Sequence, residues 1–144
     1  MTVSLFLGKE ELQMQKAQYG ILRFAKYKGP EISNIEAHNE RKKEKYASNP
    51  DIDNSRRNLN YHFIEPVGKY RAESNRLIEE YGCRTRKDSV RVVEVLITAT
   101  PEFFKGKKKS EIRAYFQTAL EFIEKYQDSE TILSAVVHMD EKTP

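Results

Sequence analysis

The sequence predicts an α+β fold in which an antiparallel-type sheet of about four strands is covered by helices. Two observations support this class. Four short segments are rich in β-branched and aromatic residues, and three longer segments between them carry apolar residues at helical spacing. The chain has 144 residues, of which 38% are hydrophobic and 33% charged, so we expect one domain with a modest core.

The first expected strand covers residues 20–27 and ends at a Gly-Pro turn. A helix is expected next, over residues 34–46. Its start is predicted by Ser33 and Glu36, which have the spacing of a capping box, and an Asn-Pro pair follows its end. This half of the chain therefore begins with a strand and a helix.

The middle of the chain repeats this order. Residues 59–64 alternate between apolar and polar positions, which predicts a half-buried strand. Residues 69–81 are expected to form a helix that stops at Gly82, because glycine readily takes the left-handed conformation that ends helices.

The last third of the chain holds the most strand-like stretch. Residues 90–98 form an almost continuous β-branched run, which is typical of a central strand buried on both faces. A helix over residues 110–126 and a final strand over 132–138 follow. Residues 1–16 differ in composition from the rest, so we expect an N-terminal extension and a domain over 17–144.

The compartment follows from what the sequence lacks. Cys83 is the single cysteine, so the chain has no internal disulfide, and neither an export signal nor a membrane-spanning apolar run is recognisable. We therefore expect a cytoplasmic protein without a membrane partner.

The net charge is only +3, but the basic residues are bunched. Phosphate contacts are made by local clusters of Lys and Arg, so nucleic acid is a candidate partner; a solvated charged surface is the alternative. The clusters are Arg56-Arg57, then Arg84, Arg86, Lys87 and Arg91, and then Lys105 with Lys107-Lys108-Lys109.

Two short motifs carry the chemistry. On the expected helix, His38 shares a face with three cations, which would hold a phosphate and keep the imidazole neutral; an exposed histidine on a charged helix is the alternative. His138, Asp140 and Glu141 follow the last strand and offer ligand and acid/base groups. The three cations are Arg41, Lys42 and Lys45.

With both motifs in view, residues 18–144 resemble the plasmid mobilisation and recombination relaxases of the Mob/Pre family, within the His-hydrophobe-His endonucleases. The resemblance rests on three ordered motifs: His38-Asn39-Glu40-Arg41, the segment from Asn49-Pro50 through Ser55-Arg56 to Asn60-Tyr61, and His138-Met139-Asp140-Glu141-Lys142-Thr143-Pro144.

The resemblance implies that the protein nicks one strand of plasmid DNA at the origin of transfer and stays linked to the 5′ end, using manganese or magnesium. His38 would be the nucleophile, Glu141 the carboxylate that activates it, and His138 the first of three metal-binding histidines. The residues expected to contact DNA, or in the middle motif to support the site locally, are Arg41, Arg56, Asn60 and Tyr61.

The family pattern continues into a His-x-His strand, and this sequence stops before it. We therefore expect a relaxase-like domain that is incomplete at its C-terminus, with two metal ligands missing. A non-catalytic DNA-binding fragment is one alternative, and a small RNA-binding α+β domain is another. A tyrosine nucleophile, with Tyr46 nearest to the first motif, is a third.

Overall fold

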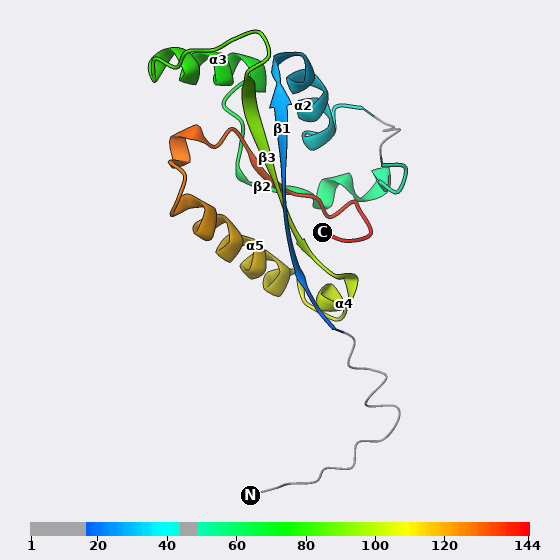
Figure 1. Ribbon diagram of the computed structural model, residues 1–144. Coiled ribbons are helices and arrows are strands. Elements are labelled where there is room, and N and C mark those ends of the chain that lie inside the picture. Colours follow the sequence, from blue (N-terminus) through cyan, green and yellow to red (C-terminus); the bar gives the residue numbers. More distant parts are fainter. Residues whose placement is uncertain (1–16, 44–48) are drawn as a thin grey trace, which may run out of the picture.

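The computed structural model describes residues 17–43 and 49–144 (Figure 1). The expected extension over residues 1–16 and the candidate nucleophile Tyr46 lie outside them. In the described residues the strands are β1 (Gly20–Lys28), β2 (Tyr61–Ile64), β3 (Val90–Ala99) and β4 (Ala135–Val137), and the helices are α2 (Ile32–Asn39), α3 (Tyr70–Glu80), α4 (Pro101–Phe104) and α5 (Lys109–Glu124). Short 3-10 segments lie at Gly29–Glu31, Asn54–Leu59 and Ser129–Thr131.

The strands form two antiparallel pairs, which confirms the α+β class with antiparallel pairing. The long pair joins β1 to β3, from Gly20 opposite Ala99 to Lys28 opposite Val90. The short pair joins β2 to β4, and Tyr61 lies opposite Val137. The four expected strands are therefore present, as two sheets of two strands each.

The prediction that β3 is buried on both faces is wrong. Val93 and Leu96 are 50% and 48% exposed, and β3 pairs with β1 alone in the described part of the chain. A continuous β-branched run favours a strand because such side chains pack well on a pleated surface. It does not say how many neighbours that strand has, and this is where the inference failed.

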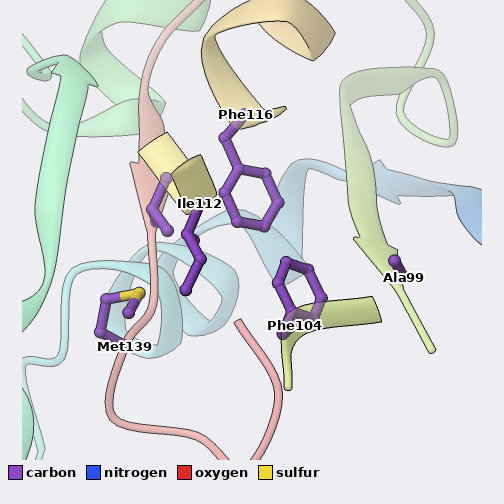
Figure 2. Close-up of a cluster of buried hydrophobic side chains, with 6 residues drawn as sticks. Ala99, Phe104, Ile112, Phe116 and Met139 are labelled. Carbon is purple, nitrogen blue, oxygen red and sulfur yellow. The ribbon is translucent and has the colours of Figure 1, made fainter. Parts of the chain in front are cut away.

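One hydrophobic cluster lies where α5 packs against the two strand pairs (Figure 2). The apolar stripe of α5 contributes Ile112 and Phe116, and the ring of Phe116 stacks on Phe104 of α4 with ring centroids 5.9 Å apart. Ala99, Val137 and Met139 complete the cluster. This core holds the end of β4 in place, and β4 leads directly to His138.

A second cluster joins α2 and α3 to the other end of the β1–β3 pair. Ile32, Ile35 and Tyr70 are buried in it, and Tyr27 of β1 and Val92 of β3 pack against them. Ile32 is 1% exposed. The apolar side of α2 therefore anchors the helix that carries His38.

The helix expected over residues 34–46 is much shorter. It starts at Ile32 without a side-chain cap, and the Glu31 carboxylate instead accepts the Lys28 amide at 2.9 Å in the preceding 3-10 turn. The expected capping role of Ser33 is therefore wrong. The helix ends at Asn39, and Arg41 has a φ of 51°, a left-handed conformation that breaks the helical path.

Other boundaries lie close to the expected ones. Helix α3 ends before Gly82, whose φ of 63° confirms the predicted stop. The strand expected from Leu59 begins at Tyr61, because the residues before it form the 3-10 turn Asn54–Leu59. No helix in the described ranges combines the length and apolar character needed to span a bilayer.

The packing of α5 predicts the effect of truncating its buried face. Phe116→Ala should lower the free energy of unfolding by about 3–5 kcal/mol, because it removes a buried ring and leaves a cavity. Phe122→Ala is the matched control on the same helix, since Phe122 is 49% exposed, and should cost less than about 1 kcal/mol. Urea denaturation of both variants measures the difference, and equal losses would contradict this core.

Candidate functional site

The guanidinium of Arg41 joins the two motifs. Its Nε and Nη2 donate to the two carboxylate oxygens of Asp140 at 2.8 and 2.9 Å, and Nη2 also donates to Glu141 Oε1 at 2.7 Å. Its Nη1 donates to the carbonyl of His38 at 2.7 Å. Arg41 has a left-handed conformation and lies beyond the end of α2, so His38, Arg41 and Lys42 do not share the expected helical face; Lys45, the fourth expected member, lies outside the described residues.

This ion pair is buried. The side chain of Asp140 is 0% exposed and that of Arg41 is 6% exposed. Burial alone would raise the pKa of the Asp140 carboxyl, but the hydrogen bonds from Arg41 and Asn60 hold it below its usual range. Burial would likewise lower the pKa of Arg41, and its two carboxylate partners raise it instead. Both groups are therefore charged at neutral pH.

Asn60 fixes the loop that carries His138 and Glu141. Its side-chain oxygen accepts the backbone amides of Met139 at 2.7 Å and of Asp140 at 3.1 Å. The Asp140 carbonyl in turn accepts the amide of Asp53 at 2.8 Å. These bonds tie the loop to the residues around the Asn54–Leu59 turn, which is the local support that the middle motif was expected to give.

His138 is oriented by the backbone of the first motif. Its Nε2 lies 2.7 Å from the carbonyl oxygen of Asn39, and because a carbonyl accepts only, Nε2 carries the proton. Burial lowers the pKa of His138, so the ring is neutral near pH 7 and its Nδ1 keeps a lone pair. Nδ1 lies 3.9 Å from Glu141 Oε1.

His38 lies beside His138. Their ring centroids are 6.5 Å apart and the rings are nearly perpendicular. Burial and the nearby Arg41 lower the pKa of His38, although Glu141 opposes this effect. His38 is therefore a neutral imidazole at neutral pH, the form in which a ring nitrogen can attack or bind.

Glu40 is a buried carboxylate that connects three further elements to the end of α2. Its Oε1 accepts the hydroxyls of Tyr70 and, at 2.8 Å, of Ser134, while Oε2 lies 2.7 Å from His62 Nε2. Burial alone would raise the pKa of Glu40, but these hydrogen bonds lower it. The Glu40 carboxylate therefore ties the end of α2 to α3, to β2 and to the residue before β4.

The remaining expected residues lie apart from this cluster. Arg56 is exposed in the Asn54–Leu59 turn, where its side chain is open to solvent. Tyr61 packs edge-on against Phe63, and the Arg113 guanidinium lies 4.8 Å from the Tyr61 ring centroid. The structure thus brings together His38, Arg41, Asn60, His138 and Glu141, and it leaves Arg56 and Tyr61 outside.

Sequence reasoning missed the partners that position the motifs. Asp140 was read as one member of a polar cluster, and its pairing with Arg41 had no signal in spacing. The roles of Glu40 and of Asn39, whose Nδ2 donates to Glu94 at 2.9 Å, were also missed. Such contacts join residues 22 to 99 positions apart, and no local periodicity reports them.

The described residues do not fit a complete metal centre. They contain no group of three or more His, Cys, Asp or Glu side chains placed to hold a metal ion. Both oxygens of Asp140 are bonded to Arg41, which leaves His138 Nδ1 and the Glu141 carboxylate as the donors nearest to one another. A catalytic metal usually takes about three protein ligands.

Removing the Arg41 guanidinium should leave the buried Asp140 carboxylate without its ion-pair partner. Arg41→Ala is expected to lower the free energy of unfolding by about 3–5 kcal/mol, and Arg41→Ala with Asp140→Asn by less than the sum of the single changes. Arg76→Ala is the control, because its ion pairs with Glu73 and Glu80 lie on the exposed surface of α3, where ion pairs add little to stability. Urea denaturation measures the losses in Arg41→Ala, Asp140→Asn, the double variant and Arg76→Ala. A loss in the double variant equal to the sum of the two single losses would contradict the pairing.

The lowered pKa of Glu40 predicts a pH dependence. The unfolded chain binds its proton at about pH 4.3 and the folded protein only at lower pH, so the stabilisation present above about pH 5 is lost as the pH falls through the depressed pKa. Glu40→Gln should flatten the decline of unfolding free energy between about pH 5 and 3. Glu79→Gln, at an exposed position of α3, should leave the decline unchanged, and an equal slope in Glu40→Gln and wild type would refute the assignment.

Comparison with known proteins places the chain in a family. A sequence model described as plasmid recombination enzyme, Mob_Pre, matches residues 16–144. A plasmid recombination enzyme of Lactiplantibacillus plantarum is 36% identical over 130 residues, which cover 88% of this chain and 36% of that protein. A type 1 enzyme of Staphylococcus aureus is 35% identical over 131 residues, covering 88% and 32%. The chain therefore spans about a third of the length of these relatives.

Solved structures agree with the sequence comparison. The MobM relaxase domain bound to plasmid pMV158 oriT DNA, in a Mn-bound crystal structure at pH 6.8, superposes with a TM-score of 0.80 at 31% identity, covering 88% of this chain and 66% of that one. A Mn-bound structure of the same domain at pH 5.5 gives a TM-score of 0.78. By its family match and by its fold, this chain belongs to the Mob_Pre family of plasmid recombination enzymes.

Proposed function

We propose that this chain carries the nucleophile-bearing part of a relaxase that nicks one strand of plasmid DNA at an origin of transfer and forms a covalent 5′-phosphate link to His38. One observation carries this proposal: Arg41 brings the His38 and His138 motifs, about a hundred residues apart in sequence, into one cluster. The relatives' names and the DNA bound by MobM support it.

The chain's own residues account for the covalent step. A bare nitrogen of neutral His38 attacks the scissile phosphorus, the bond from phosphorus to the 3′ oxygen breaks, and the imidazole passes its remaining proton to a carboxylate, for which Glu141 is the candidate. The departing 3′ oxygen takes a proton from water. Because burial keeps the imidazole neutral, the attacking form is abundant at neutral pH.

A divalent cation, manganese or magnesium, is proposed as the cofactor, and MobM structures with manganese support it. His138 Nδ1 is the candidate ligand in this chain, because Asn39 fixes the proton on Nε2. A bound cation would supply charge stabilisation at the scissile phosphate. The described residues do not complete its ligand set, so no step is derived through it.

Plasmid DNA at the origin of transfer is the proposed partner, and the cytoplasm is where we expect the encounter. Arg56 is a candidate phosphate contact because it is exposed. Arg41 and Asn60 are proposed to act on DNA indirectly, since their polar groups are engaged inside the protein. Tyr61 remains a candidate contact that would need its packed ring to be reached from outside.

Binding of DNA without cleavage is the second candidate function. The incomplete set of metal ligands within residues 17–43 and 49–144 favours it, as does the engagement of the Asp140 and Glu141 carboxylates by Arg41. It predicts salt-dependent binding with no strand cleavage when manganese is supplied.

Incubation of the chain with a labelled single strand of the pMV158 origin of transfer, with and without manganese, separates the two. Nicking predicts a DNA adduct that survives denaturation; His38→Ala should reduce it roughly 1000-fold or more, and Tyr46→Phe should leave it unchanged. An adduct of normal yield in His38→Ala would rule out this nucleophile. DNA binding without an adduct in the wild type would establish the second candidate for this chain.

A further inference from the structure

A groove rich in cations lies where β1 ends and β3 begins. Lys28 pairs with Val90 across the two strands, and the loop from α3 into β3 lies beside them (Figure 1). We call this the basic groove. It is lined by Lys26, Lys28, Pro30, Glu31, Lys87, Asp88 and Val90.

Six cations around the basic groove outnumber its two carboxylates, Glu31 and Asp88. None of these six cations forms an ion pair with another described residue, whereas Arg41, Lys42 and Arg76 do. Of the two carboxylates in the groove, Glu31 already accepts the Lys28 amide at 2.9 Å. The cations are Lys26 and Lys28 from β1 and Arg84, Arg86, Lys87 and Arg91 from the loop and the start of β3.

The loop that carries most of these cations has a defined backbone. Arg86 donates its amide to the Ser89 hydroxyl at 2.7 Å and accepts the Ser89 amide at 3.2 Å, which closes a turn. Arg91 reaches the hydroxyl of Thr85 at 3.5 Å. A loop held in this way loses less conformational freedom when an anionic partner binds.

Helix α2 leads from the edge of the basic groove to His38. Glu31 lines the groove and directly precedes α2, and His38 lies seven residues further along that helix. At about 1.5 Å per residue the separation along the helix is about 10 Å. Successive phosphates of one strand lie about 3.4 Å apart along a duplex, so roughly three phosphates span it.

We propose that the basic groove binds the sugar-phosphate backbone of the DNA whose scissile phosphate is presented to His38. This inference rests on the proposed function and names a second contact surface for the same partner. Neither the lining residues nor residues 84–91 include an aromatic side chain. The proposed contact is therefore with phosphate charge and not with stacked bases, since base stacking needs an aromatic surface.

The test neutralises three exposed cations of the groove together, as Lys28→Gln, Arg86→Gln and Lys87→Gln. Affinity for DNA is measured from low to moderate salt on a single strand and on a duplex of the same sequence. If each cation meets one phosphate, the slope of log K against log salt should become shallower by about 2 on the single strand and by about 3 on the duplex. A shallower slope with only the single strand or only the duplex identifies which form of DNA occupies the groove.

A charge-matched control neutralises Lys69, Arg76 and Lys125, three exposed cations that lie outside the basic clusters, just before α3, within α3 and just after α5. In the control variant the slope of log K against log salt should change by less than about a third of the change seen in the groove variant, because net charge alone acts weakly at a distance in salt. Wild-type slope and affinity in the groove variant, with DNA binding preserved in the parent, would overturn the groove and leave the proposed function standing. An equal loss in the control would also overturn it, and no DNA binding by the parent would overturn both.

Discussion

The fold around the site depends on one buried ion pair, between the Arg41 guanidinium and the Asp140 carboxylate. A buried charge without a partner costs several kcal/mol, so each of these residues requires the other to be in place. The pair therefore couples the end of α2 to the end of β4. The pair also offsets the cost of the left-handed conformation at Arg41, which an arginine otherwise avoids.

Two further polar ties make the arrangement rigid. Glu40 collects donors from α3, β2 and the residue before β4, and Asn60 accepts two amides of the loop after β4. Each tie satisfies polar groups that burial would otherwise penalise. Together with the Arg41 pair they fix the backbone on both sides of His38 and His138. The two imidazoles are thereby held in a partly buried, neutral state by contacts that none of the neighbouring apolar clusters could supply.

The sequence was sufficient where structure is determined locally. The strand at 20–28, the stop of α3 at Gly82 and the apolar stripe of α5 follow from short-range patterns, and all were predicted. The end of α2 was not, because residues 34–46 have acceptable helical composition and the turn at Arg41 is imposed by Asp140, 99 residues away. The structure places His38, His138 and Glu141, which the resemblance put in one site, near one another, while spacing alone could not pair Arg41 with Asp140.

Hydrogen bonding gives the adjacent carboxylates of Asp140 and Glu141 different roles. Asp140 is fully buried and uses both oxygens on the Arg41 guanidinium, so releasing it would leave two buried charges unpaired. Glu141 is 27% exposed and shares a single Arg41 nitrogen that also serves Asp140. A proton or a cation that arrives near His138 would therefore engage Glu141 at much lower cost than Asp140. This difference makes Asp140 a structural anchor and leaves Glu141 as the carboxylate that can change partners.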